Sequence, residues 1–134
     1  MKRILVRVLI FISVPVCAEE KLRFGSWTEG DIIREFIWGT LHVCDWGQTL
    51  YAADNPKRFI ERNPILGDHP SRGKVNAYMG TWLVAHPIIT NYLPREVVWL
   101  DTKIPLRAIF QSLSIGISGY SVIHNFSAGV HMSF

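Results

Sequence analysis

Residues 45–71, DWGQTLYAADNPKRFIERNPILGDHPS, contain the change from helix to loop that organises the chain. An acid, a Gln and a Thr close an otherwise apolar helical stretch, which then breaks at two Asn-Pro steps. Because the residue before a proline avoids the helical region, Asn55-Pro56 is expected to end the helix. Asn63-Pro64, Gly67 and Pro70 are then expected to form a loop, and a second helix could begin at Pro70-Ser71.

Upstream of this segment, apolar residues follow the spacing of a helix. They recur at steps of four and three, at Ile33, Ile37, Leu41 and Cys44. Thr28 is suited to cap the helix, because Asp31 places an acid near the exposed amides and the positive end of the helix dipole. These signals predict a helix over residues 31–53.

Two further helices are expected, over residues 71–93 and 104–125. The first of them carries Pro87, which would free the carbonyl of Leu83 and kink the helix. The last segment is ambiguous, because SLSIGIS alternates like a strand while polar and small residues recur at helical spacing. The helical stripe favours a helix; it consists of Arg107, Gln111, Ser114, Ser118, Ser121 and Asn125.

The first 18 residues, MKRILVRVLIFISVPVCA, combine a cationic start, an apolar centre and a small residue before the expected cut. They predict a secretory signal peptide over residues 1–18. An uncleaved anchor is the alternative, but the apolar run is short against the ~20 residues of a spanning helix. A lipoprotein modified at Cys17 is a second alternative, although VPVC lacks the expected Leu and Gly or Ala. Cleavage would leave Cys44 as the only thiol.

The leader also accounts for the formal net charge of +3. Lys2, Arg3 and Arg7 belong to it, and the other 11 Lys and Arg residues are matched by 11 acids. A chain that is neutral beyond its leader lacks the basic face that nucleic-acid binding needs, so no nucleic-acid partner is expected.

Together these elements predict a mainly α protein: a signal peptide, then a single helical domain over residues 19–134 that forms a small membrane-associated three-helix bundle. The membrane expectation rests on residues 77–93, which carry no formal charge and approach the length of a short spanning helix. Residues 126–134 alternate between apolar and polar with the period of a strand, and they predict a short extended C-terminal tail.

Polar residues mark one side of the predicted helices. Glu35, His42 and Thr49 stand at seven-residue spacing, and Asp45 falls on the same side. Such groups need partners in lipid or in a tight bundle, because burying an unsatisfied polar group costs about 1–3 kcal/mol. The candidate polar network is His42, Asp45, Gln48, Thr49, His86, Arg107 and Gln111.

Within this network we expect Asp45 to face Arg107 or Gln111, while His86 and Thr90 contribute from the second helix. A proton or ion relay is one interpretation, since ionisable residues at membrane depth often mark a pathway. A structural network that fixes how the helices fit together is the favoured one. The five His residues are scattered and no nucleophile or phosphate-loop motif is present, so no catalytic residue, metal or cofactor is expected.

Charge placement predicts an orientation. Residues 54–74 carry five Lys or Arg residues and three acids, whereas acids outnumber basic residues between positions 19 and 31. If all three helices span a membrane, an exported N-terminus puts the basic loop on the cytoplasmic side. Arg34 and Glu35 make the first helix marginal as a span, so it could instead lie along the membrane surface.

The motifs DWGQT and NPILGDHPS, with Tyr78 and the later LP and HN pairs, resemble a DWxQT…NPxLGxxPS pattern in small exported or membrane-associated proteins of proteobacterial and phage genomes. The resemblance covers roughly residues 44–129. Those proteins carry no assigned activity, so the resemblance implies no catalytic residues. It does imply that Asp45 and Gln48 belong to the same structural corner as Asn63, Pro64, Gly67 and Pro70.

The sequence therefore predicts a small exported integral membrane protein of the bacterial cell envelope, in the inner membrane. Its expected partners are membrane lipid and either a second copy or another envelope protein, contacted through helix association. A soluble periplasmic helical binding module is the alternative. An intramembrane enzyme or transporter component that uses His42, Asp45 and His86 is the second alternative.

Overall fold

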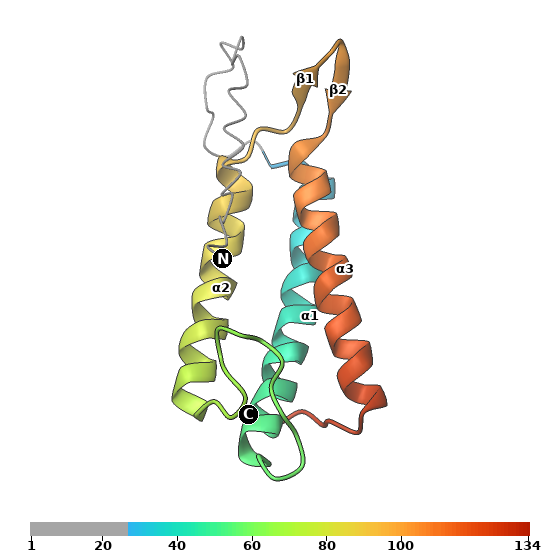
Figure 1. The fold of residues 1–134 in the computed structure, drawn as a ribbon. Coiled ribbons are helices and arrows are strands. Elements are labelled where there is room, and N and C mark those ends of the chain that lie inside the picture. Colours follow the sequence, from blue (N-terminus) through green and yellow to red (C-terminus); the bar gives the residue numbers. More distant parts are fainter. Residues whose placement is uncertain (1–26) are drawn as a thin grey trace, which may run out of the picture.

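The computed structural model describes residues 27–134, which form three long helices and a short hairpin (Figure 1). α1 spans Glu29–Asp54, α2 spans Arg72–Tyr92 and α3 spans Leu106–Ser127. β1, Val97–Trp99, and β2, Thr102–Ile104, lie between α2 and α3. The three predicted helices are confirmed, including the helical interpretation of the third segment. The predicted signal peptide lies outside the described residues.

α1 is the central helix of the fold. It packs along both α2 and α3, whereas α2 and α3 contact each other little (Figure 1). α1 and α3 run from the hairpin end of the molecule toward the opposite end. α2, which lies between them in the sequence, runs in the opposite direction. Side chains that couple the three helices must therefore come largely from α1.

A capping box begins α1, as the sequence suggested. The Thr28 hydroxyl accepts from the backbone N–H of Asp31 at 3.1 Å, and the Asp31 carboxylate accepts from the backbone N–H of Thr28 at 2.9 Å. Two amides that the helix leaves without partners are satisfied in this way. These two hydrogen bonds fix the position of the Asp31 carboxylate independently of its contacts with other helices.

Residues 55–71 form a loop that joins α1 to α2 at the end of the bundle opposite the hairpin. The carbonyl of Asn63 accepts from the amides of Leu66 and Gly67, both at 3.0 Å, and Pro64 lies within this turn. Gly67 has a φ of 76°, which a glycine adopts without strain. Pro70 is buried just before α2 begins. Leu66 enters the main apolar core, which it forms with Leu50, Val75 and Met79.

The C-terminal residues fold back onto α1. Gly129, with a φ of 78°, follows the end of α3, and the amide of Val130 donates to the carbonyl of Asn125 at 2.9 Å. Val130 is buried, and the amide of Ser133 donates to the carbonyl of Gly47 at 2.9 Å. Residues 130–134 form the short tail, but they pair with no strand in the described chain.

The hairpin was not predicted. Val97 pairs with Ile104 and Trp99 with Thr102, in antiparallel register. The two residues between the strands, Leu100 and Asp101, have φ values of 46° and 62°. Positive φ at both central positions is the geometry of a type I′ turn.

Candidate functional site

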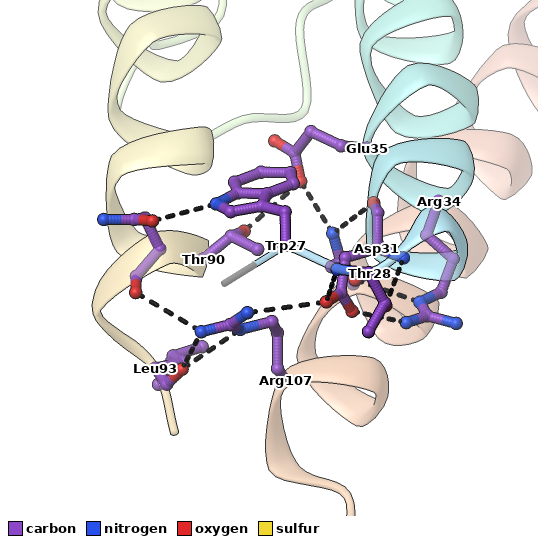
Figure 2. Close-up of polar contacts among 10 residues, drawn as sticks. Trp27, Thr28, Asp31, Arg34, Glu35, Thr90, Leu93 and Arg107 are labelled. Atoms are coloured by element: carbon purple, nitrogen blue, oxygen red, sulfur yellow. Dashed lines mark hydrogen bonds and ion pairs between the residues drawn. The ribbon is translucent and has the colours of Figure 1, made fainter. Parts of the chain in front are cut away.

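A polar cluster joins all three helices at the hairpin end of the bundle (Figure 2). Its most deeply buried side chains, Thr90 and Gln111, are 0% exposed, and the other members are buried or half-buried. The cluster consists of Asp31, Arg34, Glu35, His86, Thr90, Arg107 and Gln111.

Arg107 connects α3 to the other two helices. Its guanidinium lies 3.4 Å from the Asp31 carboxylate of α1, and Figure 2 draws this ion pair as a dashed line. It also donates to the carbonyls of Leu93, at 2.8 and 3.1 Å, and of Asn91, at 3.4 Å. Carbonyls at the end of a helix have no partner within the helix and carry its negative dipole end. Arg107 therefore caps the end of α2 and pairs with the start of α1.

The Asp31 carboxylate pairs with two guanidinium groups and also caps its own helix. Besides Arg107, its carboxylate accepts from Arg34 at 2.6 Å. Burial raises the pKa of this carboxyl, but the hydrogen bonds from Thr28 and Arg34 and the positive charge of Arg107 outweigh burial. The net pKa of Asp31 lies below its ordinary value, so the carboxylate stays ionised at neutral pH.

Gln111 bridges the cluster through both ends of its amide. Its nitrogen donates to the carbonyl of Asp31 at 2.9 Å and to the carboxylate of Glu35 at 3.0 Å, while its oxygen accepts from Arg34 Nε at 2.9 Å. Glu35 also accepts from the Thr90 hydroxyl at 3.3 Å. One side chain of α3 is thus bonded to two turns of α1, and Glu35 extends the connection to α2.

His86 completes the cluster from α2. Its Nδ1 lies 2.7 Å from Glu35 Oε1, and because a carboxylate only accepts, Nδ1 carries the hydrogen. The ring is stacked between Trp38, at 3.6 Å between centroids, and Phe110, at 4.8 Å. Nε2 of His86 is buried and has no hydrogen-bond partner in the described part of the chain.

His42 is the second histidine that stacks on Trp38. Its ring stacks on Trp38 at 4.9 Å, and its Nε2 lies 2.9 Å from the carbonyl of Met79. A carbonyl only accepts, so Nε2 of His42 is the protonated nitrogen. Both histidines therefore contact Trp38, and each of them connects α1 to α2.

Asp45 lies toward the loop end and does not face Arg107 or Gln111, so that expected pairing is wrong. Its carboxylate accepts from Asn125 at 3.3 Å, and Asn125 also donates to Gln48 at 3.2 Å. Asn125 follows Arg107 by 18 residues on the same helix, or about 27 Å at 1.5 Å per residue. The hypothesis matched the correct helices but the wrong turn of α3.

The predicted network is therefore divided along α1. His86, Arg107 and Gln111 meet at the hairpin end, and His42 lies midway. Asp45 lies near the loop end with two buried neighbours in sequence, Gln48 and Thr49. Gln48 is 0% exposed and donates to the carbonyl of Val122 at 3.2 Å.

Sequence reasoning left out two acids that hold the cluster together. Asp31 was assigned only a capping role, and the two Arg partners that it binds were not foreseen. Glu35 had a usable signal, because it precedes His42 by seven residues and so belongs to the same stripe. The predicted polar stripe includes Glu35, but the predicted network does not, and together with Arg34 it makes the first helix marginal as a membrane span.

The polar groups of the cluster bond to one another and, for Arg107, also to the carbonyls of Leu93 and Asn91, while Nε2 of His86 has no partner within the described residues. The two carboxylates and the two guanidinium groups also balance in charge. Within residues 27–134 no group of three or more His, Cys, Asp or Glu side chains could hold a metal ion. The arrangement is suited to fixing how three helices fit together.

The outward sides of the helices contrast with this interior, because they expose large apolar side chains. Phe36 is 76% exposed, Ile117 69% and Val84 62%. We call this surface the outer apolar face; it consists of Ile32, Ile33, Phe36, Ile37, Val43, Trp82, Val84, Ile88, Ile89, Tyr92, Ile109, Leu113, Ile117, Tyr120, Ile123 and Phe126.

By mean hydropathy, no helix within residues 27–134 is both long enough and apolar enough to qualify as a membrane span.

No family model, curated protein or solved structure matches the chain.

Proposed function

We propose that this protein is an exported, membrane-embedded three-helix bundle that acts by helix association, with lipid and with a second copy or another protein of the cell envelope. One observation carries the proposal: within residues 27–134, buried polar and ionisable side chains are at least as numerous as buried apolar ones, and many large apolar side chains are exposed on the outside of the bundle. In water the reverse arrangement is favoured, because apolar surface is removed from the solvent.

The placement of charge supports an embedded position. Residues 75–92 and 108–127 contain no Asp, Glu, Lys or Arg, and residues 36–53 contain Asp45 alone. At 1.5 Å per residue these helical segments are about 27–30 Å long, close to the ~30 Å hydrocarbon thickness of a bilayer. The proposal rests on these segments and on the outer apolar face, and not on the mean hydropathy of any helix.

The interior network supports the same proposal. Lipid offers no hydrogen bonds, so polar side chains at that depth have to be satisfied by neighbouring helices. Gln111, Glu35 and Thr90 meet this requirement by bonding across α1, α2 and α3. Such bonds would fix the helices relative to one another without any catalytic chemistry.

Membrane fractionation of the full-length protein, expressed with its leader in a bacterial host, tests the embedded position. We expect the protein to remain in the membrane pellet after alkaline carbonate and to be released by detergent. A processed protein that is monomeric in buffer without detergent would contradict the proposal and favour the soluble periplasmic module. N-terminal sequencing of the same sample tests the proposed cleavage after Ala18.

Helix association can be tested on the exposed side of α3. Gly116 has no heavy atom within 4 Å of a Cβ built on it, so a side chain fits there. Single cysteines at Leu113, Gly116, Ile117 and Tyr120, in a Cys44→Ser background, would be oxidised in native membranes. Dimer formation at helical spacing supports self-association, whereas its absence at all four positions leaves another envelope protein as the partner.

A further inference from the structure

We infer that the loop between α1 and α2 binds the headgroups of anionic phospholipids, and so fixes which end of the bundle faces the acidic leaflet. This inference rests on the proposed function, because it requires the helices to lie in a bilayer. The binding surface, which we call the basic loop site, consists of Lys57, Arg58 and Arg62 together with Ile60 and Ile65.

The two ends of the molecule differ in charge. Residues 54–74, at the loop end, hold five Lys or Arg residues and three acids. Residues 27–35 and 93–107, at the hairpin end, hold four Lys or Arg residues and five acids. Among the residues that the structure describes, the loop end therefore carries an excess of positive charge and the hairpin end does not, and an anionic membrane surface attracts such an excess.

Three cations of the loop end are available to a ligand. Lys57 and Arg58 are exposed and form no ion pair with any residue of the described chain. Arg62 is also exposed and approaches only a ring nitrogen of His124, at 3.3 Å. Arg72, by contrast, is paired with Asp54 at 2.5 Å.

Apolar side chains of the same loop are exposed beside these cations. Ile60 is 67% exposed and Ile65 is 62% exposed. Cationic side chains next to exposed apolar ones are typical of segments that lie at the boundary between headgroups and acyl chains. Ile60 and Ile65 would enter that boundary while the cations bind the phosphate groups.

The loop also lies at the right depth. It joins the end of α1, at Asp54, to the start of α2, at Arg72, so it lies beside the ends of two charge-poor segments, residues 36–53 and 75–92. Figure 1 shows the loop at the end of the bundle opposite the hairpin. The described chain begins at the hairpin end, so an exported N-terminus would leave the basic loop site on the cytoplasmic side.

Lipid binding to the purified full-length protein in an uncharged detergent tests the inference. Fluorescent phosphatidylglycerol and phosphatidylcholine would be titrated separately, and inorganic phosphate added as a competitor. We expect phosphatidylglycerol to bind on the order of tenfold more tightly, with the difference shrinking as salt is raised. Lys57→Glu/Arg58→Glu/Arg62→Glu should abolish the preference, and Arg95→Glu/Lys103→Glu, at the hairpin end, should preserve it.

Lys57→Gln/Arg58→Gln provides a milder variant if charge reversal prevents folding, and it should remove most of the preference for phosphatidylglycerol. Equal binding of the two lipids by the wild type would overturn the headgroup site while leaving the embedded bundle in place. An equal loss in the hairpin-end control, or displacement of the lipid by inorganic phosphate, would overturn it too. A wild type that binds neither lipid and stays monomeric without detergent would overturn the proposed function itself.

Discussion

Asp31 and Arg107 form an ion pair in which each side chain is only 5% exposed. Removing one partner of a buried pair leaves an uncompensated charge, which typically costs about 3–5 kcal/mol. We expect Asp31→Asn and Arg107→Met each to lower the free energy of unfolding by such an amount, and the double variant to lose less than the sum. A double-mutant cycle in detergent measures this coupling.

The exposed pair of Asp54 and Arg72 serves as the control for that cycle. Its nitrogen and oxygen are 2.5 Å apart, but its side chains are 38% and 41% exposed. Solvent screens such pairs, so a coupling of at most about 1 kcal/mol is expected there. Additive losses at Asp31 and Arg107 would contradict a direct interaction between them.

Asp31 should also make stability depend on acid pH. Burial raises the pKa of its carboxyl, but the contacts with Thr28, Arg34 and Arg107 lower it more, so the folded pKa lies below the unfolded value. The stabilisation is then fully present above the unfolded pKa of about 3.9 and is lost as the pH falls through the folded pKa. Unfolding measured from neutral pH downward should decline below about pH 4 in the wild type, and more shallowly in Asp31→Asn.

Gly47 is the point at which the tail approaches α1. A Cβ built there would lie 2.7 Å from Cζ of Phe134 and 3.2 Å from Cβ of Met132. Gly47→Ala should therefore displace the tail, at a cost of about 1–3 kcal/mol for the overlap. Gly39→Ala, in the same helix and with no atom within 4 Å, should instead stabilise by about 0.5–1 kcal/mol.

Thermal unfolding and limited proteolysis of the tail measure the two glycine variants side by side. Equal stability of the two, with a tail that stays protected in Gly47→Ala, would show that Phe134 does not rest against this glycine.

At the level of single residues, the sequence indicated which side chains are polar and inward-facing but not which of them meet. The spacing of Glu35, His42 and Thr49 places them on one side of α1, and that follows from helical periodicity alone. Pairing across helices depends on the axial offset between α1 and α3. That offset is set by contacts distant in sequence, such as Asn125 with Asp45, and no local pattern encodes it.

Among the elements, the helices follow from local signals, whereas the hairpin does not. Each strand has only three residues, too few for an alternating pattern to be recognised. The turn also lacks the Asn-Gly or Asp-Gly pair that usually marks a type I′ turn, because Leu100 and Asp101 occupy its central positions.

The same turn yields a prediction for the element. A non-glycine residue in the left-handed region costs on the order of 1–2 kcal/mol, and Leu100 has no short polar side chain to offset it. Leu100→Asn/Asp101→Gly should stabilise the hairpin, while Leu100→Ala/Asp101→Ala should not. Hydrogen exchange of the strand amides reports the effect, and equal protection in the two variants would argue against a type I′ turn.

For the whole molecule, the central position of α1 explains why polar residues concentrate on it. α1 contacts both other helices and supplies the acids that bind Arg107 of α3 and His86 of α2, while its remaining side exposes apolar residues such as Phe36. α2 and α3 then turn their remaining surfaces outward. Exposed apolar side chains on the outside and buried polar side chains inside are what the proposed membrane-embedded bundle requires.

A substitution at Ile117 distinguishes a bundle surrounded by lipid from one surrounded by water. It is 69% exposed and lies near the middle of residues 108–127, where the proposed bilayer would be deepest. In lipid, a lysine at that depth should cost on the order of 2.5–3.5 kcal/mol, so Ile117→Lys should reduce membrane insertion and abundance. In water the same exposed substitution would change stability by no more than about 0.5 kcal/mol. Leu100→Lys, at an 86% exposed position on the hairpin, is the matched control and should remain inserted; equal behaviour of the two variants in membrane fractionation would place α3 outside the bilayer.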